Sequence, residues 1–133
     1  MRYLLLVYGD EHALSESERE ACYRESSDLT REMYTSGHFL VTAPLHPTAT
    51  ATSVWVRDGK RLVTDGPFAE TREQLGGYFR IDASNLDEAI AIAGRIPGTR
   101  FGTVEIRPVI ELPDLPTGSL SCVPAPVHGL STN

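Results

Sequence analysis

Apolar residues fill every position of residues 3–8, Tyr-Leu-Leu-Leu-Val-Tyr. A strand that is apolar at successive positions is typical of one covered on both faces, so we expect it at the centre of a sheet. Period-2 patterns and Gly or Pro breakers predict five further strands at residues 38–42, 52–57, 61–64, 77–82 and 103–109. Between the second and third of these, Asp58-Gly59 is a two-residue hairpin signal.

Two amphipathic segments predict helices. Ser15 followed by Glu18 forms a capping box, and no Gly or Pro follows until Gly37, which predicts a helix over residues 15–36. Its thin apolar stripe consists of Cys22, Ser26, Leu29 and Met33. A second helix begins after Ser84 paired with Asp87, or Asn85 paired with Glu88, and stops before Pro97. Its predicted packing face is Leu86, Ala89, Ile90 and Ala93.

The order strand, helix, strand, hairpin, strand, helix, strand predicts an α+β fold of the ferredoxin-like βαββαβ plan with an inserted hairpin. Both helices then cover one face of the sheet, and the other face is expected to carry Trp55, Tyr78 and Arg107. A second copy packed sheet to sheet is the simplest cover, which predicts a homodimer. We expect this domain over residues 1–111. The Pro- and Ser-rich residues 112–133 form a tail that is either disordered or an extended arm across a neighbouring subunit.

Charge and cysteine content narrow the function classes. The 133 residues include 12 Lys and Arg against 18 Asp and Glu, a net charge of -6, so direct nucleic-acid or membrane binding is not expected. The only apolar run near the N-terminus is too short for a membrane span. Cys22 and Cys122 are too few for a disulfide framework and unlike a zinc site, which favours a reducing cytoplasm.

The strongest catalytic motifs do not occur. The sequence lacks a phosphate-binding loop and a Gly-x-Ser-x-Gly elbow. The four histidines form no metal-ligand pair at helical spacing. We therefore expect no metal and a cofactor-free mechanism.

The segment richest in candidate chemistry is residues 65–78, which places four charged side chains in a loop bounded by Gly and Pro. The alternative is purely structural: Asp65-Gly66-Pro67 is a turn, and Glu70, Arg72 and Glu73 are solvated charges. The two alternatives have about equal support from the sequence.

Asp65-Gly66-Pro67-Phe68, its continuation to Tyr78, and the later Val-Glu-Ile-Arg-Pro of residues 104–108 closely resemble the DGPF branch of the YCII-related family. The resemblance extends over residues 1–110 and includes the Tyr-Gly-Asp of residues 8–10. It implies a dimeric α+β barrel of ferredoxin-like subunits. Relatives in the wider family include a dehydrochlorinase acting on a muconolactone, and similar folds host cofactor-independent monooxygenases, isomerases and cyclases. DGPF members are also encoded beside, or fused to, extracytoplasmic-function sigma factors.

The wider family pattern has a His on the first helix and an Asp elsewhere as a proposed acid/base dyad. This chain has no His within residues 15–36, so the dyad does not transfer. Only Asp65, Glu70, Arg72 and Glu73 match the signature loop.

Asp65 is the predicted general base, because burial beneath a dimer partner would raise a carboxyl pKa. Arg72 or Arg107 is expected to hold a substrate oxygen, although Arg107 is slightly better explained by a structural ion pair with Glu105 or Glu73. The remaining candidates each have a structural alternative. His46 is a proton shuttle or an exposed loop residue; Trp55 and Tyr78 bind ligand or pack in the core or an interface; Tyr8 lines the pocket mouth.

Three interpretations remain open. The first is a cofactor-independent lyase, isomerase or cyclase that abstracts a proton from a lactone or polyketide-like substrate. The second is a ligand-binding or accessory module associated with a sigma factor. The third is a structural dimer in which the signature loop only closes the edge of the sheet.

Overall fold

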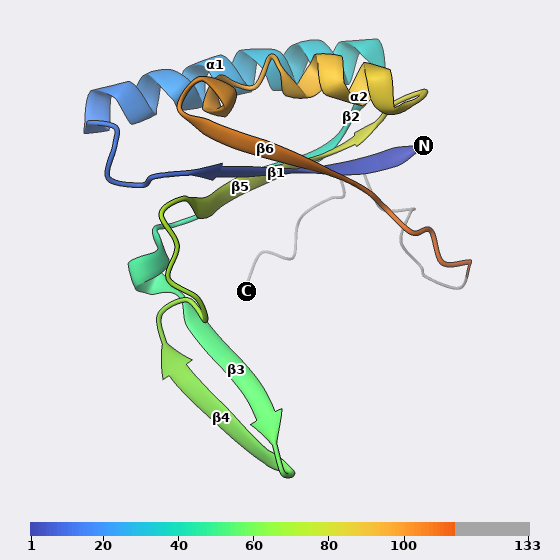
Figure 1. Ribbon diagram of the computed structural model, residues 1–133. Helices are drawn as coiled ribbons and strands as arrows, with labels where there is room; N and C mark the ends of the chain where they lie inside the picture. The colour runs from blue at the N-terminus through green and yellow to red at the C-terminus, as the bar shows by residue number, and fades with distance from the viewer. Residues whose placement is uncertain (114–133) are drawn as a thin grey trace, which may run out of the picture.

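A computed structural model describes residues 1–113 and shows one four-stranded antiparallel sheet beneath two helices (Figure 1). The sheet order is β2-β5-β1-β6. This strand order, together with the two helices that connect the strands, is that of the ferredoxin-like fold. The bounds are β1 Arg2–Gly9, β2 Phe39–Pro44, β5 Gln74–Asp82 and β6 Gly102–Pro108, with α1 Glu16–Ser36 and α2 Leu86–Ala93. The predicted α+β, ferredoxin-like class is confirmed. Most of the predicted tail, residues 114–133, lies outside the described residues.

The inserted hairpin forms a separate two-stranded sheet of β3 (Thr52–Arg57) and β4 (Lys60–Asp65). Its turn has positive φ at both central residues, 52° at Asp58 and 75° at Gly59, as the predicted two-residue hairpin requires. The hairpin extends away from the four-stranded sheet on the side opposite the helices (Figure 1). Two short 3-10 helices, η1 (Thr48–Thr50) and η2 (Pro97–Arg100), are the remaining helical elements of residues 1–113.

The core lies between the sheet and the helices. Alternate residues of the central strands point into it, and Leu5 of β1 and Ile81 of β5 are fully buried. The rest of the core is Tyr3, Leu29, Met33, Phe79, Ala83, Ala89, Ile92, Ala93 and Ile96. Tyr3 and Leu5 are buried while Leu4 and Leu6 are half-buried, so residues 1–113 fully cover only one face of β1.

The first helix begins as the sequence predicts. The Ser15 hydroxyl accepts from the Glu18 N–H, and the Glu18 carboxylate accepts from the Ser15 N–H, which completes the capping box. Gly37, at φ 86°, ends the helix in the left-handed conformation. Leu29 and Met33 are buried, so the second half of the predicted stripe packs into the core.

The packing face of α2 differs from the prediction. Asn85 is the N-cap, and its side chain accepts from the Glu88 N–H. Ala89, Ile92 and Ala93 are buried, whereas Leu86 and Ile90 are each 51% exposed. The small alanines allow the helix to lie close to the sheet, and Ile92 supplies the larger apolar contact that we had assigned to Leu86 and Ile90.

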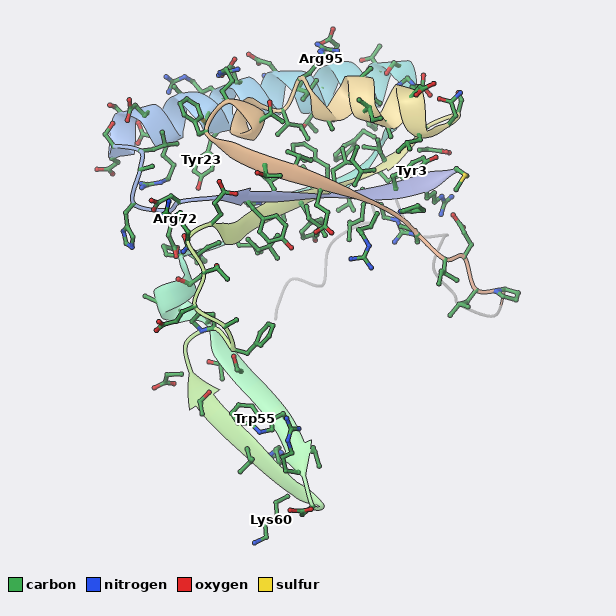
Figure 2. The ribbon with its side chains drawn as sticks, viewed as in Figure 1. Tyr3, Tyr23, Trp55, Lys60, Arg72 and Arg95 are labelled. Carbon is green, nitrogen blue, oxygen red and sulfur yellow. The ribbon has the colours of Figure 1, made fainter. Side chains whose placement is uncertain are left out.

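The face of the sheet away from the helices, called here the open face, carries two of the three predicted residues. Strand pairing places Tyr78 beside Leu6 and Arg107 beside Leu4, on the open face. The prediction for Trp55 is wrong: it pairs with Leu62 in the hairpin, away from the four-stranded sheet (Figure 2). The alternation within residues 52–57 fits a strand of either sheet, and the structure places this strand in the separate hairpin.

Candidate functional site

A cavity of about 600 Å³ opens between the first half of α1 and the sheet. It lies where β1 and β2 end and β5 begins. Helix α1 contributes Arg19, Cys22, Tyr23 and Ser26 to its lining, and Figure 2 shows Tyr23 on the side of the helix that faces the sheet. This volume is within the range of small-molecule sites, which measure about 300–1,000 Å³.

Small residues leave this space open. On α1, Cys22 and Ser26 occupy the inward stripe two turns and one turn before Leu29, respectively, so no large apolar side chain of this stripe fills the gap. On the sheet side the lining includes Gly77, where a Cβ atom would lie 3.0 Å from the Ala43 carbonyl oxygen. A side chain at Gly77 would therefore push β2 away from β5.

One end of the cavity is fixed by a hydrogen-bond network centred on Glu11. The Glu11 carboxylate accepts from the Thr48 N–H at 3.0 Å and from the Thr48 hydroxyl. The Glu11 N–H donates to the Gln74 side-chain oxygen at 3.0 Å. The bonds from the Thr48 hydroxyl and N–H lower the pKa of Glu11, which favours the ionised carboxylate. Through its carboxylate and its backbone N–H, Glu11 joins its own loop to Thr48 and to Gln74.

The cavity wall also contains a thiol. Burial raises the pKa of Cys22 above its usual range, with a smaller opposing effect from Arg100. A raised pKa keeps the thiol neutral, and a neutral thiol is a poor nucleophile. Cys22 therefore contributes shape and polarizability to the wall.

The residues around the cavity include three of those singled out from the sequence, Tyr8, His46 and Tyr78, although the pairing of Tyr78 with Leu6 directs the Tyr78 side chain to the open face. His46 is exposed, which places it at the mouth. The other candidates lie outside the lining; they are Trp55, Asp65, Glu70, Arg72, Glu73 and Arg107. The structure thus places the charged residues of the signature loop outside the cavity lining, whereas residues 74–78, which follow them, contribute to it. The roles assigned to the charged residues remain predictions.

Asp65 is exposed at the end of β4, and its carboxylate makes no hydrogen bond or ion pair within residues 1–113. The adjacent turn is structurally tied: the Gly66 N–H donates to the Ala51 carbonyl at 2.7 Å, and the Ser53 hydroxyl donates to the Gly66 carbonyl at 2.7 Å. Gly66 has φ 93°, a conformation that favours glycine. The Asp-Gly-Pro turn therefore closes the base of the hairpin.

The charged side chains that follow this turn are in contact with solvent. Glu70 and Arg72 are exposed, and Glu73 is half-buried. The Gln74 side chain donates to the Thr71 carbonyl at 2.6 Å and so shapes the loop through the backbone. On β6, Arg107 lies 3.7 Å from Glu105, the structural ion pair that the sequence favoured.

Sequence reasoning missed Glu11, Arg19 and Tyr23. Arg19 is half-buried and donates to the Leu14 carbonyl at 3.4 Å. The available signal was the change from Cys22 and Ser26 to Leu29 and Met33 along one stripe, because small residues on an inward face indicate a hollow.

Residues 1–113 contain neither a metal-binding cluster nor a helix suited to cross a membrane. No group of three or more His, Cys, Asp or Glu side chains is placed to hold a metal ion. Within the same residues, no helix has both the length and the apolar composition needed to cross a membrane.

Comparisons with known proteins agree with this architecture. The chain is 39% identical over 114 residues to "Uncharacterized protein R00369" of Rhizobium meliloti (strain 1021), an alignment that covers 82% of this chain and 92% of that protein. The YCII-related domain matches residues 1–113, which include every strand, both helices and the cavity. The chain therefore belongs to the YCII-related family.

Proposed function

We propose that this protein is a cofactor-independent enzyme that binds a small oxygenated carbon compound in the cavity beneath α1 and moves a proton on it. The cavity itself carries the proposal: it has the volume of a small-molecule site, an apolar floor that includes Val7 and Phe79, and polar groups at its mouth. A lactone or a polyketide-like carbonyl compound fits such a cavity, because its carbon skeleton can contact the apolar floor while its oxygens face the polar groups at the mouth.

The polar side chains of the cavity have two different roles, proton transfer and stabilisation of negative charge. The His46 imidazole accepts a proton from the carbon next to a carbonyl group. The Tyr23 hydroxyl and the Arg19 guanidinium donate hydrogen bonds to the oxygen on which negative charge develops. The proton then returns to another carbon in an isomerisation, or a leaving group departs with the electron pair in an elimination. Glu11 has a structural role, because its carboxylate oxygens accept hydrogen bonds from Thr48.

The test is a thermal-shift screen against lactones, phenolic acids and polyketide-like acids, followed by turnover assays on each compound that binds. A ligand at 100 times its dissociation constant adds about 2.7 kcal/mol to the free energy of unfolding. Ser26→Phe fills the cavity and is expected to abolish the shift. Ala21→Phe, on the exposed side of the same helix, is the matched control and keeps it.

Catalytic roles are separated from binding by further variants. His46→Gln should lower kcat by about 100-fold or more while the thermal shift persists. Asp65→Asn should leave turnover unchanged, because Asp65 lies outside the cavity lining; loss of turnover would return the general-base role to Asp65. Binding that survives Ser26→Phe would refute the cavity as the site. A screen with no ligand at all would favour the sigma-factor-associated accessory module.

A further inference from the structure

The cavity beneath α1 is long compared with its width. Its lining residues on α1 recur on successive turns, from Arg19 through Cys22 and Ser26 to Thr30. At a rise of about 1.5 Å per residue, Arg19 and Thr30 lie about 17 Å apart along the helix axis. Figure 1 shows α1 above the sheet, beginning beyond the C-terminal end of β1 and running back along this strand. The roof of the cavity therefore follows the direction of the strands.

The sheet forms a floor of the same length. On β5 the lining extends from Gln74 to Phe79, which spans about 17 Å at the usual rise of a strand. Val7 pairs with Gly77, and both lie on the side of the sheet that faces the helices, as does the buried Phe79. A cavity of about 600 Å³ that is about 17 Å long has a mean cross-section of about 35 Å². This shape suits a single extended chain better than a compact ring system.

The two sides of the cavity are closed by different elements. Strand β2, at one edge of the sheet, contributes Thr42 and Ala43 to the lining. Towards the other edge, the lining includes Ile96 and Gly98 of η2 and its N-cap. Gly98 packs so closely on the floor that a Cβ atom there would lie 2.7 Å from Cγ1 of Val7. These walls limit the width of a ligand, so a larger ligand has to extend along α1.

Hydroxyl groups in the inner half of the cavity, the half nearer Thr30, are bonded within the protein. The Thr30 hydroxyl donates to the Ser26 carbonyl at 2.7 Å, and the Thr42 hydroxyl donates to the Tyr78 carbonyl at 2.8 Å. Each hydroxyl proton is thereby used by the backbone, and the γ-methyl groups remain for apolar contact. Thr42 also pairs with Phe79, whose ring is buried at this end of the floor. The inner half therefore offers an apolar surface to a ligand.

The charged and titratable side chains of the lining gather at the opposite end, where α1 begins and where β1 and β2 end. They are Asp10, Glu11, Arg19 and His46. Arg19 donates to the Leu14 carbonyl and has no ion pair within residues 1–113. At the inner end, by contrast, the Arg31 guanidinium is paired with Asp28 at 2.5 Å. Polar recognition is therefore available at one end of the cavity and apolar contact at the other.

We propose that the substrate is an elongated acyl compound, such as a linear polyketide-like ester, whose carbonyl end lies among Arg19, Tyr23 and His46 and whose carbon chain extends beneath α1 to Thr30. This inference rests on the function proposed above and names its substrate class. The cavity accommodates about a dozen carbon atoms, since extended C–C bonds of about 1.5 Å advance by about 1.3 Å each. A compact lactone would leave the inner half unfilled and gain nothing from its apolar surface.

A series of chain lengths measures the depth of the site. The probes are methyl esters of straight-chain 3-oxo acids with about 4 to 14 carbons, chosen to span the length of the cavity, and δ-valerolactone is the compact comparison. Isothermal titration calorimetry gives the Kd of each compound. Each added methylene should tighten binding about fourfold, which corresponds to about 0.8 kcal/mol. The gain should end at about a dozen carbons, where the chain reaches Thr30.

Substitution of Thr30 tests where the chain lies. Thr30→Phe should end the gain about four carbons earlier, because the larger side chain fills about one helical turn of the cavity. Thr35→Phe is the matched control and should follow the parent series. Thr35 also donates its hydroxyl four residues back, to the Arg31 carbonyl at 3.1 Å, but it is exposed and lies outside the lining. Thr30→Leu adds less volume and should shift the limit by fewer carbons, and circular dichroism checks that each variant folds.

Failure of this inference and failure of the proposed function give different results. Equal affinities across the series would overturn the inference. If δ-valerolactone then bound, and lost its binding in Ser26→Phe, the proposed function would stand with a compact substrate. A series that Thr30→Phe and Thr30→Leu both leave unchanged would also overturn the inference, because the chain would then lie elsewhere. Absence of binding by every ester and by the lactone would overturn both.

Discussion

The carboxylate of Glu11 holds the backbone N–H and the hydroxyl of Thr48, and so joins the loop before α1 to η1 at the end of the cavity. The two residues are 37 positions apart in the sequence. The contact fixes the position of the β2–β3 connection, which carries His46. Cavity shape and hairpin attachment therefore depend on one hydrogen-bonded carboxylate.

Thr48→Val should lower the free energy of unfolding near neutral pH by about 1 kcal/mol. A hydrogen bond to a charged group contributes about 1.5–3 kcal/mol, and partial exposure of Glu11 reduces this. Urea denaturation measures the difference, and Thr48→Ser, which keeps the hydroxyl, is the control.

The same contact has a defined pH dependence. Because folding lowers the pKa of Glu11, its stabilisation is complete above the unfolded pKa of about 4.3 and is lost as the pH falls through the folded pKa. The difference between Thr48→Val and the parent protein should therefore shrink in acid. A difference that is equal in acid and at neutral pH would assign the loss to packing.

At the start of α2, Asn85→Ala should cost about 1 kcal/mol of unfolding free energy. The Asn85 side chain accepts from the Glu88 N–H at 2.9 Å, and removal of an N-cap leaves this donor without its partner. Asn85→Asp retains an acceptor and should lie within about 0.5 kcal/mol of the parent. Equal losses in the two variants would show that the amide acts by some other contact.

Local signals in the sequence predicted the elements well, because each rests on neighbouring residues. The capping box at Ser15, the turn at Asp58-Gly59 and the order of strands and helices follow from short-range geometry and are all found. The position of Trp55 did not follow, because period-2 alternation identifies the face of a strand but not the sheet to which the strand belongs.

The site was harder to predict for a related reason. The signature loop is conspicuous in the sequence because its charged residues lie within one short segment, whereas the cavity is assembled from α1, three strands and η2. Its lining residues come from segments that are far apart in the sequence, such as Arg19 and Tyr23 of α1 and His46 after β2, so only tertiary packing brings them together. The buried face of α2 differs from the prediction for the same reason. The helix lies close to the sheet, which places the small Ala89 and Ala93, and not the larger Ile90, in the core.

Adjacent leucines in β1 should respond differently to truncation. Leu5 is fully buried beneath the helices, so Leu5→Ala should cost about 2–5 kcal/mol at any protein concentration. Leu6 lies on the open face and is half-buried, so Leu6→Ala should cost less in the monomer and should reduce the concentration dependence of Tm. Thermal unfolding at low and high protein concentration measures both. If the two losses were equal and independent of concentration, the open face would be no interface.

The Cys22 thiol offers a probe of the cavity that does not require turnover. In a Cys122→Ser background, leaving one thiol, alkylation by iodoacetamide should be slower than for the denatured chain, and its rate should rise with a midpoint above the usual thiol pKa of about 8.5. The direction follows from burial, which disfavours the thiolate. A compound that binds in the cavity should slow alkylation further, while Ser26→Phe should slow it in the absence of ligand. Alkylation as fast as in the denatured chain would mean that the cavity wall is open to solvent, and ligand binding without protection of Cys22 would place the ligand elsewhere.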